Sequence, residues 1–345
     1  MKKPLVLLLL YLLPAPLAFF GVRGWLIRKL GVGTVLFVRK NTGLNQLALD
    51  LQSAGVVKHP RFFKFLMGVS MKIHGKRHVG YGEYLLEASD NILTIVDKLI
   101  NNRIFYRSIT FPEGLSNRSI FNIIDKNEFL SGEIANRRDI AEGSLLAETY
   151  YFKREDSRGS LVERMRRAME EFVESSWKTR DPDHSPKTKG DLLILASIVE
   201  KEAGSGAEKK LIASVFLNRL KKNMRLQSDP TAIYSYALGD VEKEKKLKTS
   251  VLVKMRSPYN TYLVRGLPPT PICNPGKESI AAVLRPAKSD YLFFVIDDRG
   301  GHNFSTNYRD HLKFVDSLRA GRRQKRPGAT RGKAKATTGA GPASR

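Results

Sequence analysis

The sequence predicts an α+β protein with an N-terminal transmembrane helix, a small mixed α/β domain and a larger mixed α+β domain. Three observations support this fold class. Residues 4–22 carry no charge, short segments rich in β-branched and aromatic residues alternate with longer segments of helical periodicity, and hydrophobic residues make up 42% of the chain. A length of 345 residues suits two domains of ordinary size.

The charge of the chain is strongly one-sided. It has 59 Lys and Arg against 34 Asp and Glu, a formal net charge of +25. A surface of this kind attracts an anionic partner, such as nucleic acid, an acidic membrane or a polyanionic wall polymer. The single cysteine, Cys273, excludes an internal disulfide framework and a cysteine-based zinc site.

The N-terminal segment predicts a membrane anchor over residues 1–22. The nineteen uncharged residues Pro4–Val22 would just cross a hydrocarbon core of ~30 Å as a helix. Two alternatives remain open, a cleaved signal peptide and a buried helix of a soluble core. Pro14, Pro16 and the small residues around them favour the signal peptide, whereas a leucine run this close to the N-terminus disfavours the core helix. Basic residues lie on both sides of the segment, so charge does not predict its direction.

Residues 30–105 are predicted to form a compact mixed α/β domain. Thr34–Arg39 has the composition of a short strand. Helical spacing of apolar residues predicts helices over Gly43–Gly55, Arg61–Met71 and Asn91–Asn101.

The second domain is predicted over residues 106–318. We expect a strand that runs into a turn at Ile109–Gly114, a helix at Leu161–Trp177, an exposed connection at Lys178–Gly190 and a buried strand at Tyr291–Asp297. Residues 319–345 are predicted to be a disordered basic tail, because eight basic residues and no acidic ones follow Gly321. Such a tail is either a solvated terminus or a weak binder of acidic polymer.

A carboxylate lies in the middle of an apolar helix face. Asp191–Gly204 predicts a helix, and its apolar residues form one continuous arc around the helix axis. Glu202 falls in the centre of that arc, whereas Glu200 points away from it. Burial should raise the pKa of Glu202, and a carboxyl that keeps its proton near neutral pH can act as a general acid. The alternative is that the last turn of this helix protrudes into solvent and leaves Glu202 simply exposed.

The residues after this helix could build a cleft around Glu202. A second helix and its exit follow at Glu208–Gln227, and Pro230 begins another helix with Ser228 or Asp229 as its cap. Ser257–Gly276 is rich in proline and brings Tyr259, Asn260, Thr261 and Tyr262 together. These side chains suit stacking and hydrogen bonding to a sugar ring, but an ordinary proline-rich surface loop fits the composition equally well.

Several chemistries have no support in the sequence. The six histidines are scattered, and no H-E-x-x-H, G-x-S-x-G, P-loop or Rossmann glycine pattern occurs. We therefore expect neither a metal site nor an organic cofactor.

The ordered motifs between Leu195 and Asn307 resemble those of one enzyme family. They are LASIVEKEA, SVFLNRL, MRLQSDPT, YNTY, GLPPTPICNPG, YLFFV and GGHNFSTN. In this order they resemble the endolytic murein transglycosylases, the MltG or YceG-like family, and the resemblance extends more thinly over about residues 34–317.

The resemblance implies a protein of the inner membrane with one N-terminal span, a small LysM-like unit and a periplasmic catalytic domain with a helical active site like that of lytic transglycosylases. It implies cleavage of peptidoglycan glycan strands between MurNAc and GlcNAc, leaving 1,6-anhydroMurNAc ends and helping to terminate strand elongation. Penicillin-binding peptidoglycan synthases are implied as partners.

The resemblance also implies roles for particular residues. The second glutamate of I-x-E-K-E, here Glu202, is the catalytic residue of the family. Candidates for the substrate-binding residues of the cleft are Gln227, Asp229, Tyr259, Asn260 and Tyr262.

Two other function classes compete with this hypothesis. A membrane-tethered scaffold that binds peptidoglycan without turnover would also suit the charge, but it has no need for an acid on an apolar helix face. A nucleic-acid binder would suit the +25 charge, yet the hydrophobic N-terminus and the lack of a nucleic-acid-binding motif argue against it.

Overall fold

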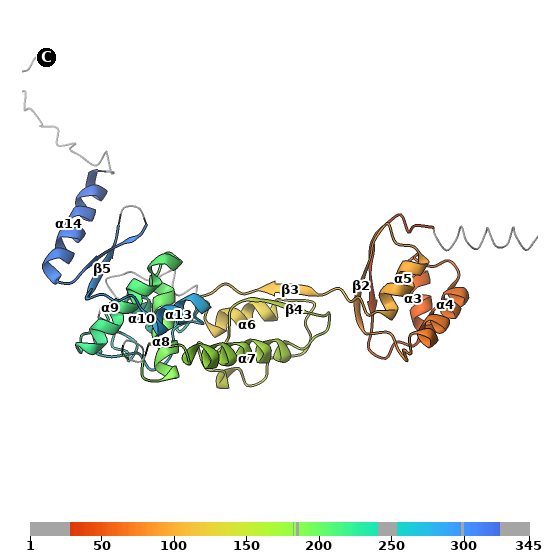
Figure 1. The fold of residues 1–345 in the computed structure, drawn as a ribbon, viewed down its shortest axis with the longest axis horizontal. Coiled ribbons are helices and arrows are strands. Elements are labelled where there is room, and N and C mark those ends of the chain that lie inside the picture. The colour runs from red at the N-terminus through yellow and green to blue at the C-terminus, as the bar shows by residue number, and fades with distance from the viewer. Residues whose placement is uncertain (1–27, 182, 184–185, 241–253, 298–299, 325–345) are drawn as a thin grey trace, which may run out of the picture. The chain divides into compact units, whose positions relative to one another are not determined.

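The computed structural model describes residues 28–181, 183, 186–240, 254–297 and 300–324. These residues form helices and three separate antiparallel pairs of strands, which confirms a mixed α+β fold in which helices predominate (Figure 1). The predicted span at residues 1–22 and residues 325–345 of the predicted tail lie outside the described residues. None of the helices in the described ranges is both long enough and apolar enough to cross a bilayer.

The chain divides into two compact units. The first comprises residues up to 111 together with 121–137 and 148–164, and the second comprises 112–120, 138–147 and the chain from 165 onward. Two helices, α6 (Asn117–Asp125) and α7 (Arg158–Trp177), contribute residues to both units. The predicted domain boundary at residue 105 stays a prediction, and the first unit extends past it.

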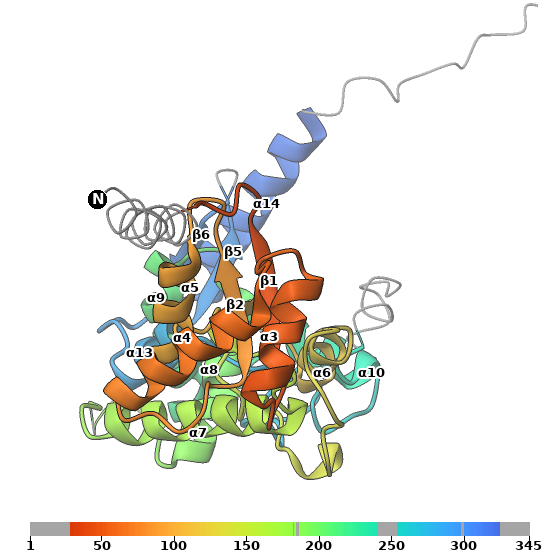
Figure 2. The same ribbon diagram turned by 90° about the vertical axis from the view of Figure 1, so that its right-hand side faces the viewer.

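The first unit begins with a strand, two helices and a returning strand. Its elements are β1 (Thr34–Val38), α3 (Leu44–Ser53), α4 (Pro60–Ile73), β2 (Gly82–Leu86) and α5 (Ile92–Ile100). All four elements predicted in this region are confirmed. β1 and β2 pair antiparallel with Val35 opposite Leu85, and the three helices cover one face of the pair (Figures 1 and 2). Alternation along the strands directs Leu36, Val38 and Leu86 into the core and leaves Val35 and Leu85 exposed.

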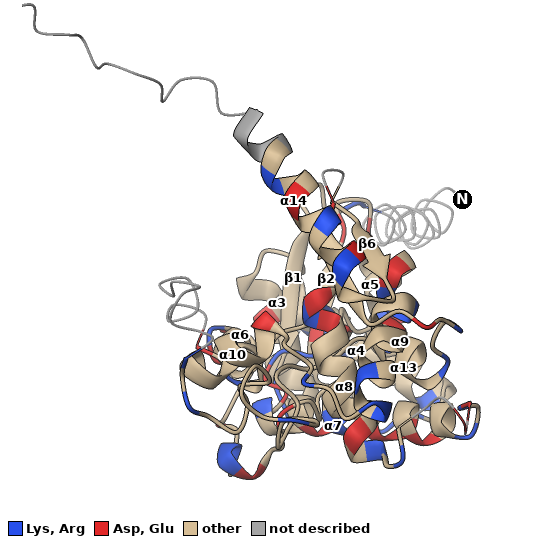
Figure 3. Ribbon diagram, turned by 90° about the vertical axis from the view of Figure 1, so that its left-hand side faces the viewer, with Lys and Arg blue, Asp and Glu red and all other residues tan. Residues whose placement is uncertain are grey.

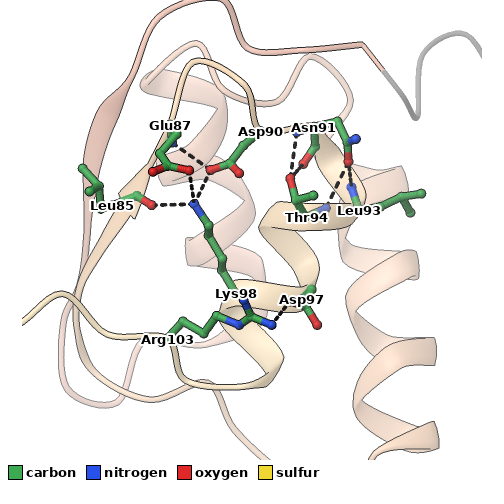
Figure 4. Close-up of polar contacts among 9 residues, drawn as sticks. All are labelled: Leu85, Glu87, Asp90, Asn91, Leu93, Thr94, Asp97, Lys98 and Arg103. Atoms are coloured by element: carbon green, nitrogen blue, oxygen red, sulfur yellow. Dashed lines mark hydrogen bonds and ion pairs between the residues drawn. The ribbon is translucent and has the colours of Figure 1, made fainter.

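A polar network fixes the start of α5 against β2 (Figure 4). The side chain of Asn91 accepts a hydrogen bond from the Thr94 backbone, and Thr94 Oγ1 accepts one from the Asn91 backbone, which completes a capping box. Lys98 extends from α5 to the Leu85 carbonyl at 3.0 Å and to Asp90 Oδ2 at 2.5 Å. The helix is thus capped by its own sequence and tied to the strand by one lysine.

A second strand pair completes the first unit. β3 (Arg107–Thr110) pairs antiparallel with β4 (Thr149–Phe152). The predicted strand therefore starts two residues before Ile109, and the turn predicted after it lies at residues 113–114. Arg107 donates two hydrogen bonds, at 2.6 and 3.0 Å, to the buried carboxylate of Glu83 on β2. This pair compensates a charge that would be costly to bury alone.

The second unit is built around α8. Its elements are α8 (Lys189–Glu202), the 3₁₀ turn η2 (Gly206–Glu208), α9 (Lys209–Lys221), α10 (Asp229–Ala237), α13 (Lys277–Leu284), β5 (Phe293–Ile296), β6 (His302–Ser305) and α14 (Tyr308–Gln324). α9, α10 and α13 all pack against α8 (Figure 1). Leu192, Leu195, Ile198 and Val199 are completely buried in this core.

The structure corrects two predictions at the C-terminal end. The strand predicted as buried, β5, is only partly buried, because it belongs to a two-stranded sheet with one packed face; Phe294 contacts Phe216 while Ile296 is exposed. Helix α14 continues to residue 324, past the predicted boundary at 318. Charges of both signs alternate along α14 (Figure 3), and Lys313 pairs with Asp310.

The proline-rich segment that could have been a surface loop is largely interior. Ile272, Cys273 and Asn274 are buried, and the Ile272 backbone donates a hydrogen bond to Ser197 Oγ on α8 at 3.0 Å. Asn274 accepts a hydrogen bond from the Leu145 backbone at 2.8 Å. For these residues the surface-loop alternative is wrong.

Candidate active site

Glu202 is the last residue of α8. The helix begins at the cap residue Thr188, whose side chain accepts a hydrogen bond from the Asp191 backbone, and it ends because Ala203 takes an extended conformation (φ −74°, ψ 121°). The predicted apolar arc is buried, and Glu202 itself is partly buried. The carboxyl group therefore extends the buried face of the helix at the point where the helix stops.

One oxygen of the Glu202 carboxyl group is held by a serine. Ser228 Oγ donates a hydrogen bond to Glu202 Oε1 at 2.6 Å. Among the described residues, Glu202 Oε2 has no hydrogen-bond partner. Because Oε1 acts as an acceptor, Oε2 is the oxygen that can carry a proton and transfer it.

The environment of Glu202 favours its protonated form. Burial raises the pKa of Glu202 to about 7, and the negative charge of Asp229 adds to this effect. The Ser228 hydrogen bond and the electrostatic interactions with His302 and Arg219 act in the opposite direction. The balance leaves a carboxyl group that can both release and accept a proton near neutral pH.

Ser228 is itself fixed by two buried threonines. Its backbone N–H donates to Thr261 Oγ1 at 3.0 Å, and its carbonyl accepts from Thr231 Oγ1 at 2.7 Å. The two threonine hydroxyls are 2.8 Å apart. Ser228 occupies the cap position of α10 but makes no side-chain cap bond, because its hydroxyl is directed to Glu202 instead.

Three of the predicted substrate-binding residues surround this serine. Gln227 and Asp229 are its exposed neighbours in sequence, and Gln227 adopts a left-handed conformation with φ 52°. Tyr262 donates a hydrogen bond to Asp229 Oδ1 at 2.5 Å. Burial and Asp229 raise the pKa of Tyr262, so the phenol stays protonated. The structure thus brings Gln227, Asp229 and Tyr262 together beside Glu202.

The other two predicted residues make interior contacts. Asn260 is completely buried; it donates to the Met255 carbonyl at 2.8 Å and accepts from the Tyr262 backbone at 3.1 Å. Tyr259 lies 2.9 Å from Thr270 through its hydroxyl, and its ring is 5.1 Å from that of Tyr234. In this arrangement Asn260 positions Tyr262, and a contact of either residue with substrate stays a prediction.

Sequence reasoning missed a pair of residues that acts on this site. The carboxylate of Glu208 accepts hydrogen bonds from the His302 backbone and from His302 Nδ1, both at 2.8 Å. This pair joins the start of α9 to strand β6. The only sequence signal was the motif GGHNF, since Glu208 stands in no recognisable motif.

Arg219 is a third residue that sequence reasoning missed. It is buried, and its guanidinium donates to the carbonyls of Leu292 at 2.6 Å and Leu226 at 2.7 Å. Burial lowers the pKa of Arg219. The residue links the end of α9 to the segment that leads into Gln227 and Ser228, and it places a positive charge close enough to act on Glu202.

The described parts of the chain contain no group of three or more His, Cys, Asp or Glu side chains placed to hold a metal ion. The arrangement at Glu202 is that of an acid–base site. It has one carboxyl group with a pKa near neutrality, one carboxyl oxygen without a hydrogen-bond partner in the described ranges, and polar and aromatic side chains beside it.

Comparison with known proteins places the chain in a family. Residues 36–317 match the YceG-like family. A protein of Bacillus subtilis (strain 168) named endolytic murein transglycosylase is 29% identical over 321 residues, covering 84% of this chain and 85% of that protein. A protein of the same name from Streptococcus pneumoniae serotype 2 is 27% identical and covers 81% of this chain; the chain spans 57% of its length.

A solved structure is also similar. The crystal structure of a putative yceG-like protein, lmo1499 of Listeria monocytogenes, has 28% sequence identity and a TM-score of 0.49, covering 83% of this chain and 99% of the other. The family match extends over most of the sequence, and the chain belongs to the YceG-like family. The curated relatives carry the name of an enzyme, endolytic murein transglycosylase.

Proposed function

We propose that this chain is a membrane-anchored endolytic lytic transglycosylase of peptidoglycan. It cleaves the β-1,4 bond between MurNAc and GlcNAc within nascent glycan strands and leaves 1,6-anhydroMurNAc ends. The observation that carries the proposal is Glu202. Its pKa of about 7, together with an Oε2 that has no hydrogen-bond partner among the described residues, suits a group that acts first as acid and then as base. The family and the names of the relatives supply the substrate class.

One carboxyl group is enough for this reaction. Glu202 Oε2 protonates the glycosidic oxygen as its bond to C1 of MurNAc breaks, and GlcNAc leaves with that proton. The carboxylate then accepts the proton of the C6 hydroxyl while the C6 oxygen forms the new bond to C1. Because the nucleophile is tethered within the same sugar, no water is consumed and no second catalytic carboxylate is needed.

The neighbouring side chains suit the binding of a sugar. Gln227, Asp229 and Tyr262 present amide, carboxylate and phenol groups beside Glu202. Such groups donate and accept hydrogen bonds to sugar hydroxyl and acetamido groups. We assign them to substrate binding, with Ser228 orienting the acid.

The first prediction tests the acid. Glu202→Gln should lower the release of anhydro-muropeptides from purified peptidoglycan by at least ~100-fold, because the amide cannot transfer a proton. Mass spectrometry of the soluble products measures the effect. The matched control is Glu170→Gln on α7, whose side chain is 70% exposed; it should keep full activity.

The same digestion separates the possible reactions. In heavy-oxygen water a hydrolase labels the new reducing ends, whereas a lytic transglycosylase gives unlabelled ends lighter by one water. Long glycan fragments at early times would indicate internal cleavage. Labelled ends would contradict the proposed mechanism, and wall binding without any product would favour the scaffold alternative.

We further propose that residues 1–22 anchor the protein in the cell inner membrane with the catalytic domain in the periplasm, where nascent strands and penicillin-binding synthases are found. An alkaline phosphatase fusion at the C-terminus, which is active only outside the cytoplasm, tests this orientation. An inactive fusion that is stably produced would contradict it.

A further inference from the structure

Helix α4 of the first unit has an exposed apolar row. Phe63 and Met67 are completely buried on its inner side, whereas Phe65, Val69 and Ile73 are 64%, 43% and 74% exposed. Their spacing of four residues places them along one face of the helix. In Figure 2 α4 crosses the front of the first unit, and no other described element of that unit lies over it. A row of this kind usually marks an interaction surface.

The flank of this row is basic. Arg61, Lys64 and Lys72 lie on α4 next to the apolar row and are exposed. From residue 51 to residue 82 the chain has no Asp or Glu, and its Lys and Arg residues are Lys58, Arg61, Lys64, Lys72, Lys76 and Arg77. Apolar side chains flanked by lysine and arginine are typical of helices that lie in the interface of an anionic bilayer.

The first unit is also tied close to the predicted membrane span. Only five residues separate Val22, the last residue of the apolar segment, from Arg28, the first described residue. A chain of that length reaches at most ~20 Å. Leu30 and Gly31 then donate backbone hydrogen bonds to the carbonyls of Asp90 and Ala88 at 2.8 and 3.0 Å, which fix the chain to the first unit.

We propose that the exposed face of α4 lies in the headgroup region of an anionic phospholipid bilayer. Phe65, Val69 and Ile73 enter the interface, and the flanking lysines and arginine contact lipid phosphates. A polysaccharide wall would also attract the basic residues, but it offers no apolar phase for the row, so the lipid surface fits better. This inference rests on the membrane anchoring proposed above. It gives the first unit a second attachment, which would hold it at the membrane surface.

The test uses the full-length protein in vesicles that contain phosphatidylglycerol and phosphatidylcholine. The environment-sensitive fluorophore NBD is attached at Val69→Cys, since the native Cys273 is buried. The matched control is Val35→Cys on the exposed face of β1, because Val35 is also a valine that is 43% exposed. We expect a blue shift and quenching by spin-labelled lipids at position 69 but not at position 35. The double variant Lys64→Glu/Lys72→Glu should reduce the quenching at position 69 severalfold.

Three outcomes would overturn the proposal. The NBD label at position 69 could remain unquenched in anionic vesicles, or the labels at positions 69 and 35 could respond alike. The emission of the label at position 69 could also shift to the blue without quenching by lipid, which would mean that another protein surface covers α4. Alkaline carbonate extraction tests the anchor separately. A chain that is washed off the vesicles refutes the N-terminal span, whereas lipid quenching before the wash still reports on α4.

Discussion

At the scale of single residues, the pKa of Glu202 depends on a few neighbouring groups, some of which raise it while others lower it. Burial and Asp229 raise its pKa, whereas Ser228, His302 and Arg219 lower it. The proposed acid must be protonated, so we expect the rate to be steady below pH ~7 and to fall above it as Glu202 ionises. The alkaline limb of the pH–rate profile therefore reports the pKa of this residue.

Two substitutions should move this limb in opposite directions. Asp229→Asn removes a negative charge but keeps an acceptor for Tyr262, so the pKa of Glu202 falls and the limb moves to lower pH. Ser228→Ala removes a hydrogen bond that favours the ionised form, so the pKa rises and the limb moves to higher pH. The rate of anhydro-muropeptide release between about pH 5 and 9 measures both, with an expected few-fold difference between the variants above neutrality. Identical profiles would mean that another group limits the rate.

At the scale of elements, Glu200, the first glutamate of the I-x-E-K-E motif, connects two helices. Glu200 on α8 accepts hydrogen bonds from the Gly276 backbone at 3.0 Å and from Ser279 Oγ at 2.5 Å, both at the start of α13. The buried Lys209 lies 3.4 Å from the same carboxylate. A Cβ atom at Gly276 would fall 1.9 Å from the Glu113 carboxyl group, so a larger residue there would require the Glu113 side chain to move. Glu200 and Glu202 thus face different partners, as the helical wheel predicts.

Removal of the Glu200 carboxylate should therefore destabilise the second unit. Glu200→Ala leaves Lys209 without its nearest partner and the start of α13 without an acceptor, at an expected cost of about 3 kcal/mol in the free energy of unfolding. Urea denaturation followed by circular dichroism measures this. Lys201→Ala, at the exposed position next to it, should change the stability by less than ~0.5 kcal/mol. Equal effects of the two substitutions would refute the structural role of Glu200.

At the scale of the whole molecule, the net charge of +25 is the most unusual property. Several acidic residues are neutralised locally, as in the Arg107–Glu83 and Lys98–Asp90 pairs. The excess of positive charge that remains can act at long range on an anionic polymer. Peptidoglycan stems carry carboxylates, so the charge of the protein and that of the proposed substrate are opposite in sign and attract each other.

Binding to the wall should accordingly depend on salt. We expect the affinity of Glu202→Gln for purified peptidoglycan to fall about tenfold between ~0.05 M and ~0.5 M NaCl, because the screening length shortens to a few ångström. Co-sedimentation measures the bound fraction. Peptidoglycan with amidated stem carboxylates is the control and should bind more weakly at low salt. Equal binding to both polymers would show that attraction to the stem carboxylates does not contribute to the binding of peptidoglycan.

The local pattern of the sequence was sufficient to predict the helices α3, α4, α5 and α8 and the place of Glu202 on the buried face of α8. Helical periodicity and caps are properties of neighbouring residues, and a carboxyl group on an apolar arc is visible without any coordinates. The same reasoning missed α13, whose partners α8 and α9 lie far away in the chain. It also missed β6 and α14, which pack against β5 and each other close by in the sequence. It also overestimated the burial of β5, because the number of strands in a sheet is not a local property.

The tertiary structure alone decided which side chains act on Glu202. Ser228 reaches it across 26 positions, and Glu208 holds His302 across 94. Ser228 has the sequence context of an ordinary helix cap, and only the folded chain directs its hydroxyl elsewhere. Periodicity could place a carboxyl group on a buried face, but its pKa depends on the charges and hydrogen bonds that meet there, and these come from segments that folding brings together.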